Sequence, residues 1–272
     1  MDKLVGSPTE AVTDITSGSV LAVGGFGLCG VPFALIDALL SQGADGLTTI
    51  SNNCGVDDQA LGVLLYAGRI TRTISSFVGG NKELARLYLS GALEVELTPQ
   101  GTLAERLRAG GTGIPAFYTP TGVGTMVAEG GIPVRYDADG NVVKTSEPKE
   151  VRVFDGQQYV LETALTADFG LVRAAVGDRH GNLVFHESAR NFNPLAGMAG
   201  RITIAEVEEL VEPGEIRPED VHLPGVFVDR VVVVGSEGKQ IENRTTRPRP
   251  AAGTDDFAAP AAAGEEATEG AA

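Results

Sequence analysis

The feature that most limits the fold is an alternation of short apolar runs and helix-like stretches through the first third of the chain. The apolar runs are short and predict buried strands, at residues 19–23, 47–51 and 70–77. The stretches between and after them carry apolar residues at helical spacing and predict helices, at residues 32–41, 57–67 and 82–89. Strands separated by helices of this length form βαβ units. We therefore expect a mostly parallel sheet.

The second half of the chain is less regular. Residues 100–109 predict one more helix, and residues 110–131 are dense in Gly, Pro and Thr and predict a long ordered loop. Further strands are expected at residues 151–154, 159–161, 171–176, 182–185, 203–211 and 230–234. The run EVEELV at 206–211 alternates acidic and apolar residues, which is typical of a strand with one face in water. These patterns predict one α/β domain: an open, mostly parallel sheet flanked by helices, elaborated in its second half and without a visible internal repeat.

Composition divides the chain into a body and a tail. Residues 248–272 contain 16 Ala, Pro or Gly among 25 residues and no periodic apolar face. Such a segment cannot offset the entropy lost on ordering. We therefore expect a domain at residues 1–247 and a disordered acidic tail at residues 248–272.

Charge and residue usage exclude several classes of protein. The net charge of -15 argues against a nucleic-acid-binding surface, which needs clustered positive charge. The 2 cysteines give neither a disulfide framework nor a zinc ligand set, and the 3 histidines are scattered, so no metal is expected. No apolar run approaches the roughly 18 residues of a membrane span, and the first residues carry no apolar signal-peptide core. We expect a cytoplasmic protein that does not contact membranes.

A glycine-rich turn follows the first predicted strand. Its residues of interest are Gly24, Gly25, Phe26, Gly27 and Gly30. Glycine allows sharp turns and close approach of a ligand, and the following helix start favours anions. The spacing also satisfies the G-x-G-x-x-G fingerprint of dinucleotide-binding folds. That fold requires an acid at the end of the second strand, where residues 51–53 read Ser-Asn-Asn. A tight turn without a ligand is the remaining alternative.

The pattern Gly-Gly-Phe-x-x-x-Gly-x-Pro at 24–32, preceded by Leu-Ala-Val, resembles the signature of the family I CoA-transferases. The match is to the A subunit of 3-oxoacid CoA-transferases that use succinyl-CoA. Other segments resemble the family in the same order, at residues 51–55, 88–91, 97–103, 114–120, 188–193 and 218–224. Ser17 is a departure, because the signature usually has Asp or Asn there, but it touches no chemistry.

The resemblance implies a reaction and places residues in it. Members of the family move CoA between two carboxylic acids through acyl anhydride and glutamyl-CoA thioester states on a glutamate nucleophile. Each step develops an oxyanion, which preorganised neutral donors stabilise. The resemblance places Asn52, Asn53 and Gln100 near the reacting thioester as such donors, and makes the glycine-rich turn a loop for CoA or substrate. The alternative for the asparagines is that they cap a strand-to-helix turn.

The nucleophile itself is missing from the sequence. In the family it lies in the B half, in a Ser-Glu-Asn-Gly segment, and no such segment occurs here. Ser236, Glu237 and Gly238 come close but lack the Asn, and we interpret them as a loop. The resemblance therefore implies a chain that pairs with a separate B subunit in an α2β2 assembly. CoA is then a substrate, and no cofactor is expected.

Other interpretations stay open at this point. A sugar-phosphate isomerase-like enzyme or a ligand-sensing domain has a similar fold, and a non-catalytic scaffold subunit is a third possibility. Cys29 is either a reactive thiol or, as we favour, a small residue that fills the turn. Arg190, Asn191 and Asn193 either contact a partner or a CoA phosphate, or bond a loop between strands. The acceptor acid, whether acetoacetate, 3-oxoadipate or a shorter acid, is not specified by the sequence.

Overall fold

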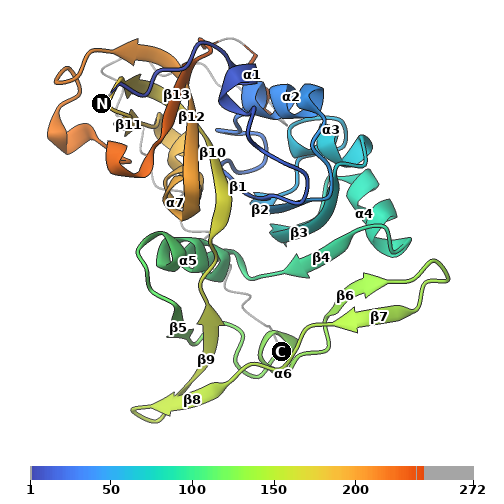
Figure 1. The fold of residues 1–272 in the computed structure, drawn as a ribbon. Helices are drawn as coiled ribbons and strands as arrows, with labels where there is room; N and C mark the ends of the chain where they lie inside the picture. The colour runs from blue at the N-terminus through green and yellow to red at the C-terminus, as the bar shows by residue number, and fades with distance from the viewer. Residues whose placement is uncertain (1, 237, 242–272) are drawn as a thin grey trace, which may run out of the picture. The chain divides into compact units, whose positions relative to one another are not determined.

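The computed structural model describes residues 2–236 and 238–241. Within this part, an eight-stranded sheet has the strand order β13-β12-β10-β1-β2-β3-β4, with β11 added to β10 (Figure 1). All neighbours in that order are parallel, and only β11 runs antiparallel to its partner. The open, mostly parallel sheet expected from the sequence is confirmed.

The strands of this sheet are β1 (Val20–Val23), β2 (Leu47–Asn53), β3 (Ile70–Phe77), β4 (Glu94–Leu97), β10 (Ala167–Asp178), β11 (Leu183–Val184), β12 (Gly200–Val211) and β13 (Arg230–Val233). The helices that accompany it are α1 (Pro8–Ala11), α2 (Phe33–Gln42), α3 (Leu61–Tyr66), α4 (Lys82–Leu89), α5 (Gln100–Gly111) and α7 (Asn193–Ala199). Three 3₁₀ turns, η1 (Glu187–Arg190), η2 (Pro218–Asp220) and η3 (Gly225–Phe227), lie in the connections.

Each face of the sheet has its own apolar core. One cluster joins α1 to α4 with residues such as Leu35, Leu39, Leu64 and Leu84, all almost fully buried. On the opposite face a second cluster contains Leu103 and Leu107 of α5 and Ala196 and Ala199 of α7. β1 (VLAV) is apolar on both sides, as expected for a strand whose two faces are buried, whereas β2 and β3 also bury hydroxyl groups such as those of Thr49, Thr73 and Ser75.

Strand order reverses at the centre of the sheet. From β1 the chain builds outward through β2, β3 and β4, and then returns to place β10 on the other side of β1. In open α/β sheets, ligands bind outside the carboxyl ends of the strands at such a switch point. The fold therefore directs attention to the loops that follow β1 and β2.

The expectation of a long loop at residues 110–131 is wrong. The structure places β5 (Ala116–Thr119) and α6 (Met126–Glu129) there, followed by β6 (Pro133–Tyr136) and β7 (Val142–Thr145), which were not predicted. β5 pairs with β9 (Gln157–Thr163), and β9 with β8 (Val151–Phe154), in a separate three-stranded sheet. β5, α6, β6 and β7 are each four residues long, so their local signals are weak. β8 and β9 confirm the strands expected at residues 151–154 and 159–161.

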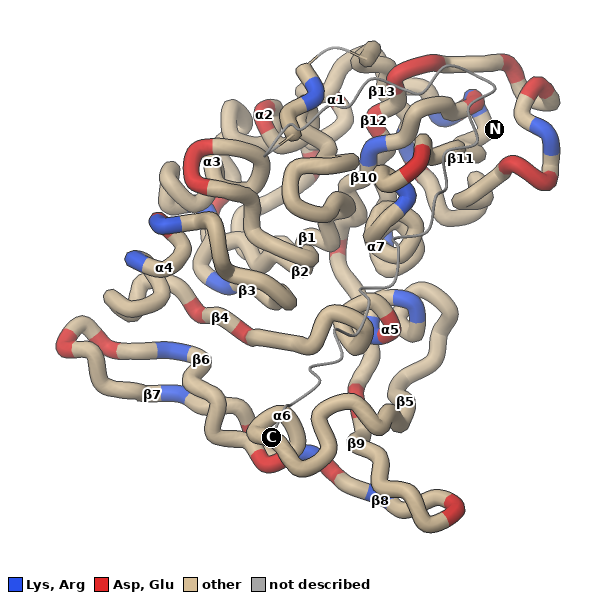
Figure 2. The backbone as a smooth tube through the Cα atoms, turned by 180° about the vertical axis from the view of Figure 1, so that it is seen from behind, with Lys and Arg blue, Asp and Glu red and all other residues tan. Residues whose placement is uncertain are grey.

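Ion pairs connect the β6–β7 hairpin and helix α5 to β4, the strand at one edge of the large sheet. Glu94 of β4 lies 2.8 Å from Lys144 of β7, and Glu96 lies 2.9 Å from Arg106 of α5. The basic residues of β6 and β7 and the acidic residues of β4 are visible in Figure 2. β4 was also missed by the sequence patterns, and its cover by the β6–β7 hairpin protects an edge that is otherwise open to pairing.

The loops that follow β1 and β2 have similar backbone conformations, although the sequence shows no internal repeat. The first loop (residues 24–32) joins β1 to α2, and the second loop (residues 54–62) leads from β2 into the first residues of α3. An isolated antiparallel bridge forms in each, Phe26 with Cys29 and Val56 with Gln59. α3 begins at Leu61, four residues after the start of the helix that was expected at residues 57–67.

The predicted tail at residues 248–272 lies outside the described residues, and so does Glu237. In the part that is described, none of the helices combines the length and the apolar character that a membrane crossing requires. Nor do three His, Cys, Asp or Glu side chains of residues 2–236 and 238–241 gather in a way that could hold a metal ion.

Candidate active site

The predicted donors meet at the carboxyl edge of the sheet. Asn52 and Asn53 end β2, and Gln100 begins α5 directly after β4. Parallel strands end at the same edge, so residues distant in sequence come together there. Asn52 and Asn53 are 3% and 8% exposed, whereas Gln100 is exposed. The three amides therefore run from the buried sheet toward solvent.

These amides form one chain of hydrogen bonds. Gln100 Nε2 donates to Asn52 Oδ1 at 2.7 Å, and Asn52 Nδ2 donates to Asn53 Oδ1 at 3.0 Å. The hydroxyl of Ser76, at the end of β3, lies 2.9 Å from Asn52 Oδ1 and 3.1 Å from the Asn52 carbonyl oxygen. An amide nitrogen carries two hydrogens, so Gln100 keeps one N–H beyond this bond. We call Gln100, Asn52 and Asn53 the amide chain.

At its buried end the amide chain is attached to the first loop. Asn53 accepts from Gly27 N at 2.8 Å and donates to Gly27 O at 3.2 Å and to Gly55 O at 3.4 Å. Both hydrogens of the Asn53 amide are thus directed at carbonyl oxygens of the two loops. Asn53 accordingly holds loops, which is close to the turn-capping alternative, whereas Asn52 and Gln100 are the better placed donors.

The glycines of the first loop are explained by packing. A Cβ on Gly24 would lie 2.0 Å from Asn193 Oδ1, and one on Gly30 would lie 2.8 Å from Asn193 Nδ2. Gly30 also has a φ of 73°, which favours glycine. Asn193 begins α7, is 0% exposed, and donates to Gly30 O at 2.9 Å. The role of the loop in binding CoA stays a prediction.

Residues 188–193 support the first loop from the β10 side. Asn191 Nδ2 donates to Cys29 O at 3.1 Å, and Cys29 Sγ lies 3.3 Å from Ser188 Oγ. The asparagines of this segment bond a loop, which was one of the two interpretations of the sequence, while Arg190 is exposed. These contacts agree with Cys29 as a small residue that fills the turn.

The start of α2, which the sequence suggested as an anion site, already binds a carboxylate of the protein. Glu206 of β12 accepts from Leu35 N at 3.0 Å and forms a 2.6 Å ion pair with Arg173 of β10. Glu206 is 0% exposed, so the expectation that its run faces water is wrong at this position. Burial raises the pKa of Glu206 to about 7, against the opposing effect of Arg173.

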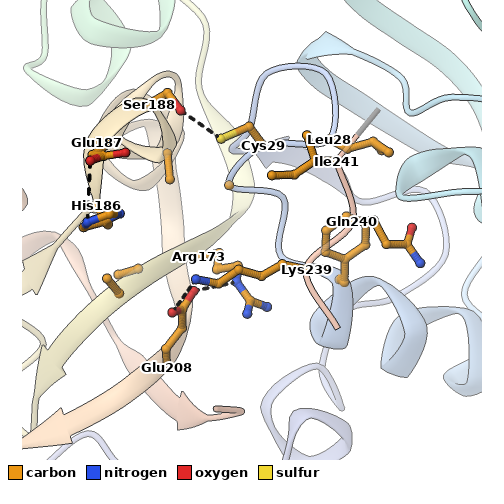
Figure 3. A pocket seen from close by; sticks show the side chains of 15 residues that line it. Leu28, Cys29, Arg173, His186, Glu187, Ser188, Glu208, Lys239, Gln240 and Ile241 are labelled. Carbon is orange, nitrogen blue, oxygen red and sulfur yellow. Dashed lines mark hydrogen bonds and ion pairs between the residues drawn. The ribbon is translucent and has the colours of Figure 1, made fainter. Parts of the chain in front are cut away.

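A small cavity lies beside Arg173 and is lined in part by residues of the first loop (Figure 3). Its volume is about 180 Å³, and Cys29, Ser188, Arg173, Glu208 and Lys239 are among its lining residues. Its charges are already paired, because Glu208 lies 3.3 Å from Arg173 and 2.7 Å from Lys239. Three of its charged residues, Arg173, Glu208 and Lys239, are therefore engaged with one another.

Among the described residues, the hydrogen bonds of the amide chain involve no carboxylate. In the part of the chain that the structure describes, the site therefore presents amide N–H donors that bond to neutral groups. Sequence reasoning missed Ser76, although it ends β3 as the asparagines end β2 and the same argument would have found it. It also missed the Arg173–Glu206 pair, because alternation in a strand does not reveal which side an opposing helix covers.

Comparison with known proteins decides between the alternatives. Residues 5–234 match the family described as Coenzyme A transferase. The chain belongs to this family. It is 64% identical over 247 residues to the A subunit of a probable succinyl-CoA:3-ketoacid coenzyme A transferase of Mycobacterium bovis, a match that covers 91% of this chain and 100% of the relative. The A subunit of the corresponding Xanthomonas campestris pv. campestris transferase is 58% identical over 233 residues, 86% of this chain and 89% of the relative.

Longer relatives match over part of their length. The chain is 50% identical over 250 residues to the mitochondrial succinyl-CoA:3-ketoacid coenzyme A transferase 2A of Rattus norvegicus, which covers 92% of this chain but 48% of that one. An acyl-CoA transferase apoenzyme from Escherichia coli O157:H7 superimposes with a TM-score of 0.71 at 25% identity, over 86% of this chain and 47% of that one. The resemblance, the fold class and the enzyme class expected from the sequence are confirmed.

Proposed function

We propose that this coenzyme A transferase chain is the A subunit of an enzyme that moves CoA from succinyl-CoA to a 3-oxoacid, with acetoacetate and 3-oxoadipate as candidate acceptors. A partner B subunit supplies the glutamate nucleophile, and the two chains assemble as α2β2. The observation that carries the proposal is the amide chain, which holds neutral donors at the carboxyl edge of the sheet without a carboxylate among its partners.

The chemistry explains why such a half-site is useful. The partner's carboxylate attacks the succinyl thioester carbonyl and releases CoA thiolate, leaving a mixed anhydride. The thiolate then attacks the glutamyl carbonyl, which releases succinate and leaves a glutamyl-CoA thioester. The acceptor acid repeats the two steps in reverse and leaves with CoA. Each attack places negative charge on a carbonyl oxygen, and an N–H fixed in advance stabilises it.

Neutral amides suit this reaction better than basic side chains. The site must accommodate two carboxylate substrates in turn, together with the carboxylate nucleophile of the partner. A fixed positive charge would bind each of these carboxylates in its ground state. Asn52 and Gln100 donate without carrying charge, so they favour the oxyanion without retaining the free acids.

The partner is expected to cover the same edge. Phe26 at the tip of the first loop is 50% exposed, and Phe77 at the end of β3 is 58% exposed. Phe77 is paired in register with Asn53, which itself holds the loop next to Phe26. Two exposed aromatic rings beside the amide chain are the kind of anchor that protein interfaces bury.

The proposal is tested by assaying CoA transfer from succinyl-CoA to acetoacetate and to 3-oxoadipate, with this chain alone and with its co-purified partner. We expect activity only with the partner. Mass spectrometry after incubation with succinyl-CoA and no acceptor should find CoA attached to the partner. CoA attached to this chain would contradict the proposal, and Glu237 would then be the first residue to replace.

The donor role is tested by Gln100→Ala in the assembled enzyme. Loss of an oxyanion donor typically lowers kcat by about 10² to 10³. Gln59→Ala is a matched control, because Gln59 lies in the second loop and is not part of the amide chain. A loss of less than about threefold for Gln100→Ala would contradict the role.

A further inference from the structure

The direction in which Gln100 presents its N–H is determined by the backbone N–H and C=O of Gly27, at the far end of the amide chain. Gly27 N can only donate and Gly27 O can only accept, and both contact the Asn53 amide, at 2.8 Å and 3.2 Å. This fixes which end of Asn53 is oxygen and which is nitrogen. The opposite orientation would place two donors together and two acceptors together.

The same reasoning extends outward along the amide chain. Since Asn53 Oδ1 can only accept, the Asn52 atom 3.0 Å from it is the nitrogen. The other end of Asn52 is therefore the oxygen, so the Gln100 atom 2.7 Å from it is Nε2. A rotated Gln100 would oppose its own oxygen to Asn52 Oδ1. The backbone N–H and C=O of one residue of the first loop, Gly27, thus orient all three amides.

Ser76 reinforces the outer half of this arrangement. Its hydroxyl lies 2.9 Å from Asn52 Oδ1, the atom that also accepts from Gln100. A hydroxyl that donates there polarises the acceptor and holds it as an oxygen that faces Gln100. The neighbouring Ser75 points elsewhere, since its hydroxyl lies 2.9 Å from Thr73 Oγ1 and it is 0% exposed.

We propose that Ser76 and Asn53 are positioning residues of the transfer reaction, which act through Gln100 by holding its donor in the orientation that faces the oxyanion. The inference rests on the proposed function for its kinetic test. It adds that the first loop contributes through the backbone N–H and C=O of Gly27, so a movement of this loop changes the donor without contacting it.

The decisive measurement is a double-mutant cycle in the co-purified enzyme. Ser76→Ala should lower kcat about tenfold with KM changed less than about threefold, because one hydrogen bond that orients a donor is lost. In a Gln100→Ala background the same substitution should lower kcat less than about twofold, since the group it positions is absent. An equal loss in both backgrounds would overturn the proposal, because a merely structural role is independent of Gln100.

Two variants serve as controls for folding and chemistry. Ser75→Ala removes a hydroxyl from the adjacent residue of the same strand, outside the amide chain, and should leave kcat within about twofold of the parent. Ser76→Thr keeps a hydroxyl on a strand residue and should recover most of the activity that Ser76→Ala loses. A Ser76→Thr enzyme as slow as Ser76→Ala would count against the hydroxyl.

Asn53→Asp adds a signature that depends on pH. Its carboxylate would face Gly27 O and Gly55 O, where Asn53 now donates, so the pKa of the new carboxyl is raised. The protonated form can donate again. The ratio of variant kcat to parent kcat should therefore rise as the pH falls, and a ratio independent of pH would contradict the orientation argument.

A spectroscopic readout separates this proposal from the proposed function. In the assembled protein, the side-chain ¹⁵N–¹H signals of Gln100 are identified by their loss in Gln100→Ala. Ser76→Ala should shift them and Ser75→Ala should not. Unchanged signals in Ser76→Ala would overturn the positioning role. If the parent enzyme transfers no CoA, the proposed function fails, while these signals still decide whether Ser76 orients Gln100.

Discussion

The first and second loops follow the same path, but they use it differently. In the first loop, Gly24 and Gly30 leave no room for a side chain, because Asn193 occupies the space where a Cβ would lie. At the corresponding places the second loop has Cys54 and Ala60, which carry side chains and are buried. The shared course comes from joining a strand to a helix in one sheet. The difference comes from what packs outside, since the first loop lies against the segment that leads into α7.

The two loops also differ in how they are connected to the amide chain. Asn53, which ends β2, donates to Gly27 O of the first loop and to Gly55 O of the second loop. Through Asn53 the first loop is joined to Asn52 and Gln100. The second loop is also bonded to the start of α4, because Asp57 Oδ1 accepts from Lys82 N at 2.7 Å. We therefore expect added side-chain volume to be damaging at Gly24 and Gly30, whereas the corresponding residues of the second loop, Cys54 and Ala60, already carry side chains. Gly55 leaves as little room in the second loop, since a Cβ there would lie 2.3 Å from Gly62 N.

The largest difference is expected where Gly24 corresponds to Cys54. Gly24→Ala would bring a Cβ within 2.0 Å of Asn193 Oδ1 and 3.0 Å of Asn193 Cα, so α7 or β1 must shift. Overpacking of this kind should lower the free energy of unfolding by about 3 kcal/mol or more. Cys54→Ala removes one sulfur from a buried site and should lower it by about 1 kcal/mol. Urea unfolding of both variants measures the contrast, and equal losses would contradict it.

A smaller difference is expected where Gly30 corresponds to Ala60. Gly30→Ala places a Cβ 2.8 Å from Asn193 Nδ2 and 3.0 Å from Ala189 O at a φ of 73°, and should lower the free energy of unfolding by about 2 kcal/mol. Ala60 has a φ of 54°, so Ala60→Gly relieves strain but adds flexibility to the unfolded chain. These effects nearly cancel, and we expect a change below about 1 kcal/mol. Thermal unfolding of the pair sharpens the comparison, which fails if Ala60→Gly is the more damaging change.

The sequence predicted the first half of the fold well, because there each element is specified locally. The run at 70–77 matches β3 (Ile70–Phe77), and the helix expected at 82–89 matches α4 (Lys82–Leu89), whose Asn81 caps it by accepting from Leu84 N. β3 is rich in the β-branched residues Ile and Thr, which favour a strand, and helices are indicated by the spacing of apolar residues and by caps. Between α5 and β10, the strands expected at residues 151–154 and 159–161 match β8 and β9, whereas β5, α6, β6 and β7 are four-residue elements that the local patterns did not identify.

The candidate site was predicted in the same uneven way. Residue type and the family resemblance selected Asn52, Asn53 and Gln100, and the structure joins all three in one chain of hydrogen bonds. The sequence could not show toward which neighbours these side chains are oriented. That Asn53 turns toward Gly27 depends on contacts between β2 and the first loop, and that Glu206 reaches the start of α2 depends on the register of β12. Neither follows from residue spacing.

The smallest expected effect is a loosening of the first loop by acid. His222 Nδ1 accepts from Phe185 N at 3.0 Å, just before the segment that supports this loop. Burial and the nearby Arg190 lower the pKa of His222 from its ordinary 6.5, while Asp220 opposes them. The folded state thus prefers neutral His222. Its contribution to stability is complete above pH 6.5 and is lost as the pH falls through the lowered pKa.

Hydrogen exchange at neutral and mildly acidic pH, corrected for intrinsic rates, tests this sign. Amides of residues 24–32 and 186–193 should lose protection at the lower pH, and those of residues 54–62 should keep it, because the second loop is fastened through Asp57 and Lys82 rather than through the His222 contact. His222→Gln is the matched control, since its side-chain oxygen can accept from Phe185 N without titrating. Protection that falls equally in both loops, or that falls in His222→Gln as well, would assign the acid effect to another group and remove the difference between the loops.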